Sequence, residues 1–144
     1  MASQQRDYIL RLIEQLREFL IEVVRLRETG RVDQALTAII QAQERLLSLP
    51  SERFLTASPE ELFQLLIRGE TPDNAREKSL LQVDLLIEIA RVYEQKEQPA
   101  LATGAWRFTH ELIALATAMF PDTADLALAR RQDEVSRHLD HAGA

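Results

Sequence analysis

Apolar residues recur three and four positions apart along most of this chain, and that spacing predicts amphipathic α-helices. Glycine and proline divide the pattern into six segments, which begin near residues 5, 32, 59, 72, 99 and 123. Their expected ends lie near residues 29, 48, 68, 95, 119 and 139, and we expect residues 138–144 to fray. The sequence therefore predicts a single all-α domain over residues 1–144, folded as a compact bundle of about six helices.

Two helix boundaries carry specific signals. Gly30 follows the first segment and suits the left-handed backbone conformation that ends many helices. Ser58, Pro59 and Glu61 have the spacing of an N-cap, a first-turn proline and a capping-box glutamate. These signals predict a hairpin between the first two helices and a helix start at Pro59.

A helical-hairpin pattern occurs twice with the same spacings. In each copy a large residue is followed nine positions later by a small one, then by a bulky residue and by another small one. The two sets are Leu26, Ala35, Ile39 and Ala42, and Tyr93, Ala102, Trp106 and Thr109. A small residue at the crossing lets two antiparallel helices approach closely, so we expect Trp106 to be a core residue beside that contact.

This spacing resembles the tetratricopeptide repeat, whose helix pairs meet through small residues. The run from Asp7 to Leu16, followed by the hairpin at Gly30, also resembles a family of small bacterial all-helical proteins with a domain of unknown function. The resemblance implies tetratricopeptide-like hairpins that serve as a protein–protein interaction scaffold, and it carries over no catalytic residues. It also implies a groove lined by inward-facing residues of the first helix of each pair.

Two segments are apolar around most of their circumference. In residues 80–93 the charged residues Asp84, Glu88 and Arg91 interrupt a largely apolar sequence, which predicts the central helix of the bundle. The first helix is similar, so it must pack on more than one side. Its second side could be buried within the monomer, in a symmetric homodimer or against another protein. The surface expected to form a homodimer interface comprises Tyr8, Ile9, Leu10, Ile13, Leu20, Ile21 and Val24.

Few residues suggest chemistry. Glu134, His138 and His141 lie on one side of the last helix and form a weak candidate for a metal site, although dipole interactions and solvated ion pairs explain them without metal. His110 is expected to be a buried or half-buried histidine with a hydrogen-bond partner rather than a general base. No phosphate-binding loop, nucleophile elbow or zinc-protease motif is present in the sequence. We therefore expect no enzymatic activity and no cofactor.

Composition narrows the functional classes. A formal charge of −6, with arginines interleaved among glutamates in the first helix, argues against a nucleic-acid partner. The absence of cysteine and of a signal-peptide pattern favours the cytoplasm, and no apolar run is long enough to predict a membrane span. The sequence thus predicts a non-enzymatic scaffold that binds a protein or peptide. The alternative is a regulatory domain that binds a small molecule or metal near His110 or His138.

Overall fold

The computed structural model describes the backbone of residues 2–121 and 126–143, and the side chains of residues 8–121 and 126–142. It confirms the predicted all-α bundle. The six helices are α1 (Ala2–Glu28), α2 (Val32–Leu47), α3 (Pro59–Ile67), α4 (Pro72–Gln95), α5 (Pro99–Met119) and α6 (Ala127–Gly143). A short 3-10 helix, η1 (Ser51–Arg53), lies between α2 and α3 and was not predicted from the periodicity.

The boundary signals in the sequence correspond to real caps. The Ser58 hydroxyl accepts a hydrogen bond from the Glu61 N–H at 3.1 Å, and the Glu61 carboxylate accepts one from the Ser58 N–H at 3.2 Å. Gly30 has a φ of 84°, a left-handed conformation that costs glycine little. The turn at Gly30 reverses the chain, and the capping box fixes the start of α3.

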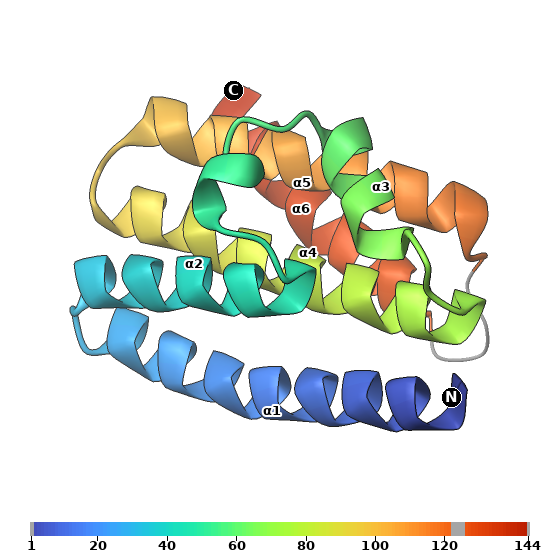
Figure 1. Cartoon of the computed structure of the whole chain (residues 1–144). Helices are drawn as coiled ribbons and strands as arrows, with labels where there is room; N and C mark the ends of the chain where they lie inside the picture. The colour runs from blue at the N-terminus through green and yellow to red at the C-terminus, as the bar shows by residue number, and fades with distance from the viewer. Residues whose placement is uncertain (1, 122–125, 144) are drawn as a thin grey trace.

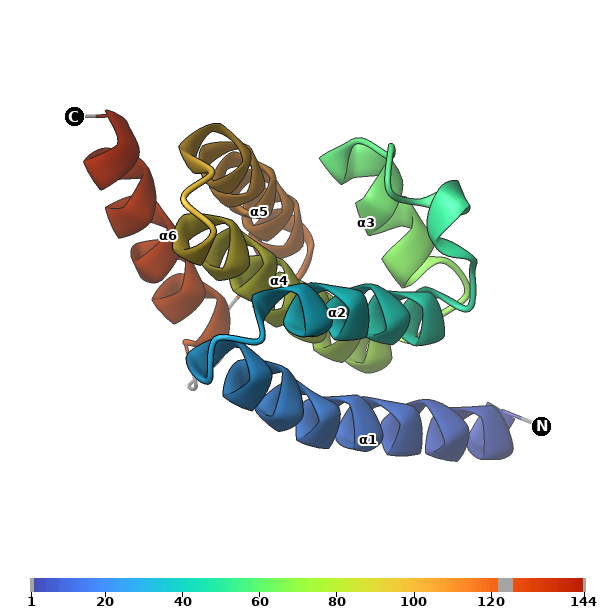
Figure 2. The same cartoon turned by 90° about the vertical axis from the view of Figure 1, so that its left-hand side faces the viewer.

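Helix α4 lies at the centre of the bundle, as its nearly all-round apolar sequence predicts. It packs most extensively against α5 and also contacts α1, α2, α3 and α6. Figures 1 and 2 show α1 along one edge of the bundle and α5 and α6 beyond α4. Buried α4 side chains such as Leu81, Leu85 and Val92 each contribute about 1.5–3 kcal/mol through burial alone.

The hairpins α1–α2 and α4–α5 place the repeated small residues in the core. Ala35 and Ala102 are both buried, as are the bulky residues Ile39 and Trp106 four positions later. The buried positions of the two hairpins therefore match the residue spacing seen in the sequence.

Helix α1 packs on two sides within the monomer, against α2 and against α4. Ile13, which the sequence placed in a homodimer interface, is only 2% exposed and belongs to the core. Tyr8 and Ile21 are 60% and 62% exposed, and Leu10 is also exposed. Ile9, Leu20 and Val24 are half-buried. The rest of the bundle thus covers part of the surface that suggested self-association, and self-association stays a prediction at the exposed positions.

The polar residues of α4 join it to its neighbours. Glu88, almost fully buried, accepts hydrogen bonds from Arg27 of α1 and from Arg91 one turn further along α4, both at 2.9 Å. Arg91 also pairs with Glu134 of α6. Because the buried carboxylate of Glu88 has two opposite charges within hydrogen-bonding distance, the core tolerates it.

The chain end differs from expectation. We predicted that residues 138–144 fray; Ala144 lies outside the described residues, and over the others α6 continues to Gly143. Leu139 packs against the core, and His138 contacts both α4 and α5. These contacts explain why the helix continues past residue 139. None of the helices in the described part of the chain is long and apolar enough to cross a membrane.

Candidate functional site: an apolar groove beside the central helix

An apolar groove with a volume of about 340 Å³ lies among α2, α4, α5 and the segment from η1 to α3. Leu36 and Ile40 of α2 form one wall, and Leu101 and Phe108 of α5 form the other. The C-terminal half of α4 forms the floor, and the segment from η1 to the start of α3 closes one end. Floor and end wall include Leu86, Ile89, Tyr93, Phe54, Leu55 and Leu62.

The groove exposes large apolar side chains that a folded chain normally covers. Leu55 is 57% exposed and Leu101 is 52% exposed. They come from different elements, and both border the groove. Scattered exposed leucines are common on protein surfaces, but apolar residues gathered in a concave site usually mark a binding surface. The volume is within the range of ligand pockets, about 300–1,000 Å³.

Gly104 lines this groove in the interior of α5. Glycine in a helix interior costs about 1 kcal/mol relative to alanine. A Cβ added at Gly104 would have no atom within 4 Å outside its own helical neighbourhood, so no packing contact requires a glycine there. The space beside Gly104 is open, and it adjoins the groove.

Gln43 is the buried polar group of the groove. The residue is 3% exposed, and its side-chain oxygen has no hydrogen-bond partner among the described residues. Leaving a buried polar group unpaired costs about 1–3 kcal/mol. An otherwise apolar groove thus contains one amide oxygen that lacks a donor.

The composition of the groove differs from the sequence-based expectation. The groove was expected to be lined by the first helix of each pair; α4, the first helix of the second pair, forms its floor, but α1 contributes none of the described lining residues. The walls come instead from the second helices, α2 and α5, because α1 packs directly on α4. Leu55 and Gly104 gave no signal in the sequence, since η1 was not predicted and a single helical glycine has many explanations.

A second hollow, of about 550 Å³, lies where α6 meets the start of α5. The rings of Trp106 and His138 stack there with centroids 3.9 Å apart and planes inclined by 16°. His138 Nδ1 also lies 3.3 Å from a carboxylate oxygen of Glu94. Trp106 is buried, as predicted, and its indole N–H has no hydrogen-bond partner among the described residues.

The suggested metal ligands Glu134, His138 and His141 line one hollow beside α6, but each has another partner. Glu134 pairs with Arg91, His138 faces Trp106 and Glu94, and His141 Nδ1 lies 2.8 Å from the backbone oxygen of Arg137. Within the described residues, no three histidine, aspartate or glutamate side chains form a group that could hold a metal ion. The i, i+4, i+7 spacing predicted that the three side chains lie on one side of the helix. Glu134 and His138 instead contact residues of α4 and α5.

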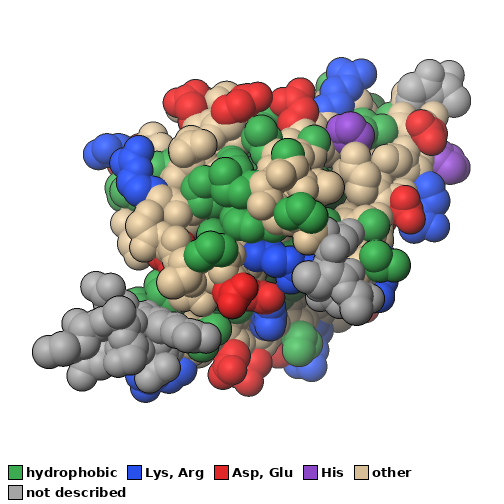
Figure 3. All heavy atoms as spheres, turned by 90° about the vertical axis from the view of Figure 1, so that its right-hand side faces the viewer, with side chains coloured by type: hydrophobic (Ala, Val, Ile, Leu, Met, Phe, Trp, Pro, Cys, Tyr) green, Lys and Arg blue, Asp and Glu red, His purple; other side chains and the backbone are tan. Residues whose placement is uncertain are grey.

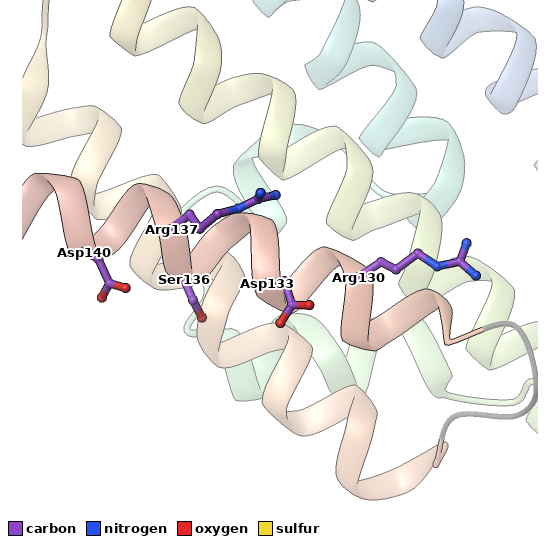
Figure 4. A pocket seen from close by; sticks show the side chains of 5 residues that line it. All are labelled: Arg130, Asp133, Ser136, Arg137 and Asp140. Atoms are coloured by element: carbon purple, nitrogen blue, oxygen red, sulfur yellow. The ribbon is translucent and has the colours of Figure 1, made fainter.

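Other candidate positions offer less. His110 is half-buried on α5 and is not among the residues that line the groove or the hollow beside Trp106. A shallow depression on α6 is lined by residues of that helix alone, among them Arg130, Asp133 and Asp140 (Figure 4). Hydrophobic side chains also gather on the opposite end of the molecule from Figure 2 (Figure 3).

Comparison with known proteins found no matching family model, no matching curated protein and no matching solved structure.

Proposed function

We propose that this protein is a non-enzymatic interaction module that binds an apolar segment of another protein in the groove between α2 and α5. The observation that carries the proposal is the gathering of exposed apolar side chains from separate elements in one concave site, around Leu55 and Leu101. Amphipathic segments bind such grooves by inserting apolar side chains spaced along one helical face. The proposed setting is the cytoplasm, which suits a chain without cysteine.

Two further features support binding over catalysis. The residues around the groove are nearly all apolar, and the buried ionisable residues of α4 have charged partners: Glu88 pairs with Arg27 and Arg91, and Lys78 pairs with Glu70. The two hairpins also place Ala35 and Ala102 at buried positions, as expected for the scaffold proteins that the sequence resembles. An interaction role therefore accounts for the groove without requiring a reactive group.

Filling the groove tests the proposal. Gly104→Leu places a side chain in the groove and improves helix propensity, so the variant should fold. Ala114→Leu adds similar bulk on an exposed part of α5 that does not line the groove and is the matched control. A display library of random peptides would be selected on the wild-type protein, and the selected peptides measured by fluorescence anisotropy.

The selected peptides should bind the wild type and Ala114→Leu alike and should bind Gly104→Leu about tenfold or more weakly, a loss of 1.4 kcal/mol or more. Circular dichroism would confirm that both variants are folded. Equal binding to all three proteins would contradict the groove as the interaction site.

Self-association through α1 is a separate part of the proposal. Leu10 and Ile21 are exposed and lie about 20° apart around the helix axis, so both could enter one two-fold interface. Glu14 and Arg17, also exposed, lie between them. Ile21→Glu should convert a dimer into a folded monomer in light scattering. A monomeric wild type at micromolar concentration would refute the homodimer.

A small-molecule-binding regulatory domain is the alternative, and the hollow beside Trp106 favours it. Glu94 and Glu97 line this hollow together with His138, a composition that suits a cationic ligand. Spermidine is a suitable probe, and the single tryptophan, Trp106, reports on its binding. A saturable fluorescence change that Glu94→Gln removes would support this role, and no change would argue against it.

A further inference from the structure

We propose that the groove recognises an aromatic side chain that carries an N–H or O–H donor, and that Gln43 accepts the hydrogen bond from it. This inference rests on the proposed function, because it specifies which kind of side chain the partner inserts. Two independent observations point to it: the amide oxygen of Gln43 without a partner, and the open space beside Gly104, which adjoins the groove.

The first step concerns the amide. A buried oxygen without a donor destabilises the folded chain, and an apolar side chain of the same length would avoid that cost. Gln43 faces a groove whose other lining side chains are nearly all apolar. A ligand that brings a donor would satisfy the amide oxygen in a surrounding of low polarity, where a hydrogen bond is stronger than in water.

The second step concerns reach. The Gln43 oxygen is itself buried, but the terminal torsion of a glutamine side chain is broad and roughly two-fold, so the amide can turn its oxygen toward the groove while its NH2 group takes the buried place of the oxygen. An aromatic ring fits between the walls formed by Leu36 and Phe108, where its area is buried against apolar atoms. A polar tip on that ring then reaches the amide without exposing the rest of the ring to water.

The third step excludes the purely apolar alternative. A leucine or phenylalanine in the groove would leave the Gln43 oxygen unpaired, as it is in the unliganded protein, and would gain no hydrogen bond from it. A donor-bearing ring gains that bond. Sites built around a buried polar group discriminate against analogues that lack the matching group.

Matched fragments test the inference without knowledge of the partner. Indole carries an N–H donor, and benzofuran has the same shape with an oxygen in its place. Binding would be measured by NMR on protein labelled at isoleucine methyl groups. Ile40 and Ile89 report on the groove, and the exposed Ile21 of α1 is the internal reference. Each fragment would be titrated into the wild type and into Gln43→Met, which keeps side-chain length and removes the acceptor.

Indole should shift the Ile40 and Ile89 signals and should bind the wild type about three- to tenfold more tightly than benzofuran, the range expected for one hydrogen bond. Gln43→Met should abolish that difference while remaining folded. Equal binding of both fragments to the wild type, in the groove, would overturn the role of Gln43 and leave the groove as an apolar site. If neither fragment shifts the groove signals, both this inference and the proposed groove are wrong.

Discussion

Replacing Gln82 by methionine should stabilise the protein. Gln82 is fully buried in α4, and neither its amide nitrogen nor its amide oxygen has a hydrogen-bond partner among the described residues. A buried polar group left unpaired costs about 1–3 kcal/mol. Methionine has a similar length, comparable helix propensity and a flexible side chain that fills the same space without polar atoms.

We expect the free energy of unfolding of Gln82→Met to exceed that of the wild type by about 1–3 kcal/mol. For a chain of 144 residues this corresponds to a rise in Tm of about 3–10 °C. The assay is urea denaturation followed by circular dichroism, with Tm measured separately. The control is Gln41→Met in α2, where the glutamine is exposed and the change should stay within about 0.5 kcal/mol.

A loss of stability in Gln82→Met, with an unchanged denaturant dependence, would refute this reasoning. It would mean that the Gln82 amide is paired in solution, because removing a satisfied buried amide leaves its partner without a hydrogen bond. An equal gain in Gln41→Met would show that methionine acts through helix propensity and that burial of the amide is not the cause.

Three further variants test the packing around α4, each by chemical denaturation. His138→Ala should lower the free energy of unfolding by about 1–2 kcal/mol and shift Trp106 emission to the red, because the ring that covers the indole is lost. His141 is exposed, so His141→Ala should change stability by less than about 0.5 kcal/mol. Equal losses of stability in the two variants would contradict the stacking. Glu88→Ala should cost about 3–5 kcal/mol, since it leaves two arginines without their shared carboxylate; a cost below about 1 kcal/mol would mean that the pair behaves as if exposed. Burial lowers the pKa of Lys78 below its ordinary value of 10.5, against the opposing effect of Glu70, so the unfolded chain binds more protons than the folded one just below pH 10.5. The free energy of unfolding of the wild type should therefore rise with pH in that window relative to that of Lys78→Met. Parallel pH profiles of unfolding free energy for the two proteins would contradict the lowered pKa.

Local signals in the sequence predicted most of the fold. The capping box at Ser58 and the glycine at position 30 act within a few residues of themselves, so their effect can be deduced from sequence alone. The spacing from Ala35 to Ile39 reports which side of α2 is buried, for the same reason. The short helix η1 escaped prediction because three residues are too few to show a period.

The groove and the chain end depend on contacts between distant segments. Leu55 and Leu101 are 46 positions apart in the sequence, and nothing in their local patterns indicates that they border one groove. We expected His138 to lie in a frayed tail. Its ring stacks on Trp106, which lies on another helix, and the local sequence around His138 gives no sign of that contact. Gln43 and Gly104 became informative only when the surroundings of the amide oxygen and of the missing side chain were known.

Site-specific photo-crosslinking in cells tests the groove most directly. A benzophenone amino acid would replace Leu101, which borders the groove, or Met119, which is exposed on the same helix and does not line it. The adducts would be identified by mass spectrometry. If the groove holds a partner segment, the Leu101 position should yield a discrete adduct with one protein, absent from the Met119 position and lost when Gly104→Leu is added. The same adducts from both positions, or an adduct that persists in Gly104→Leu, would contradict binding in the groove.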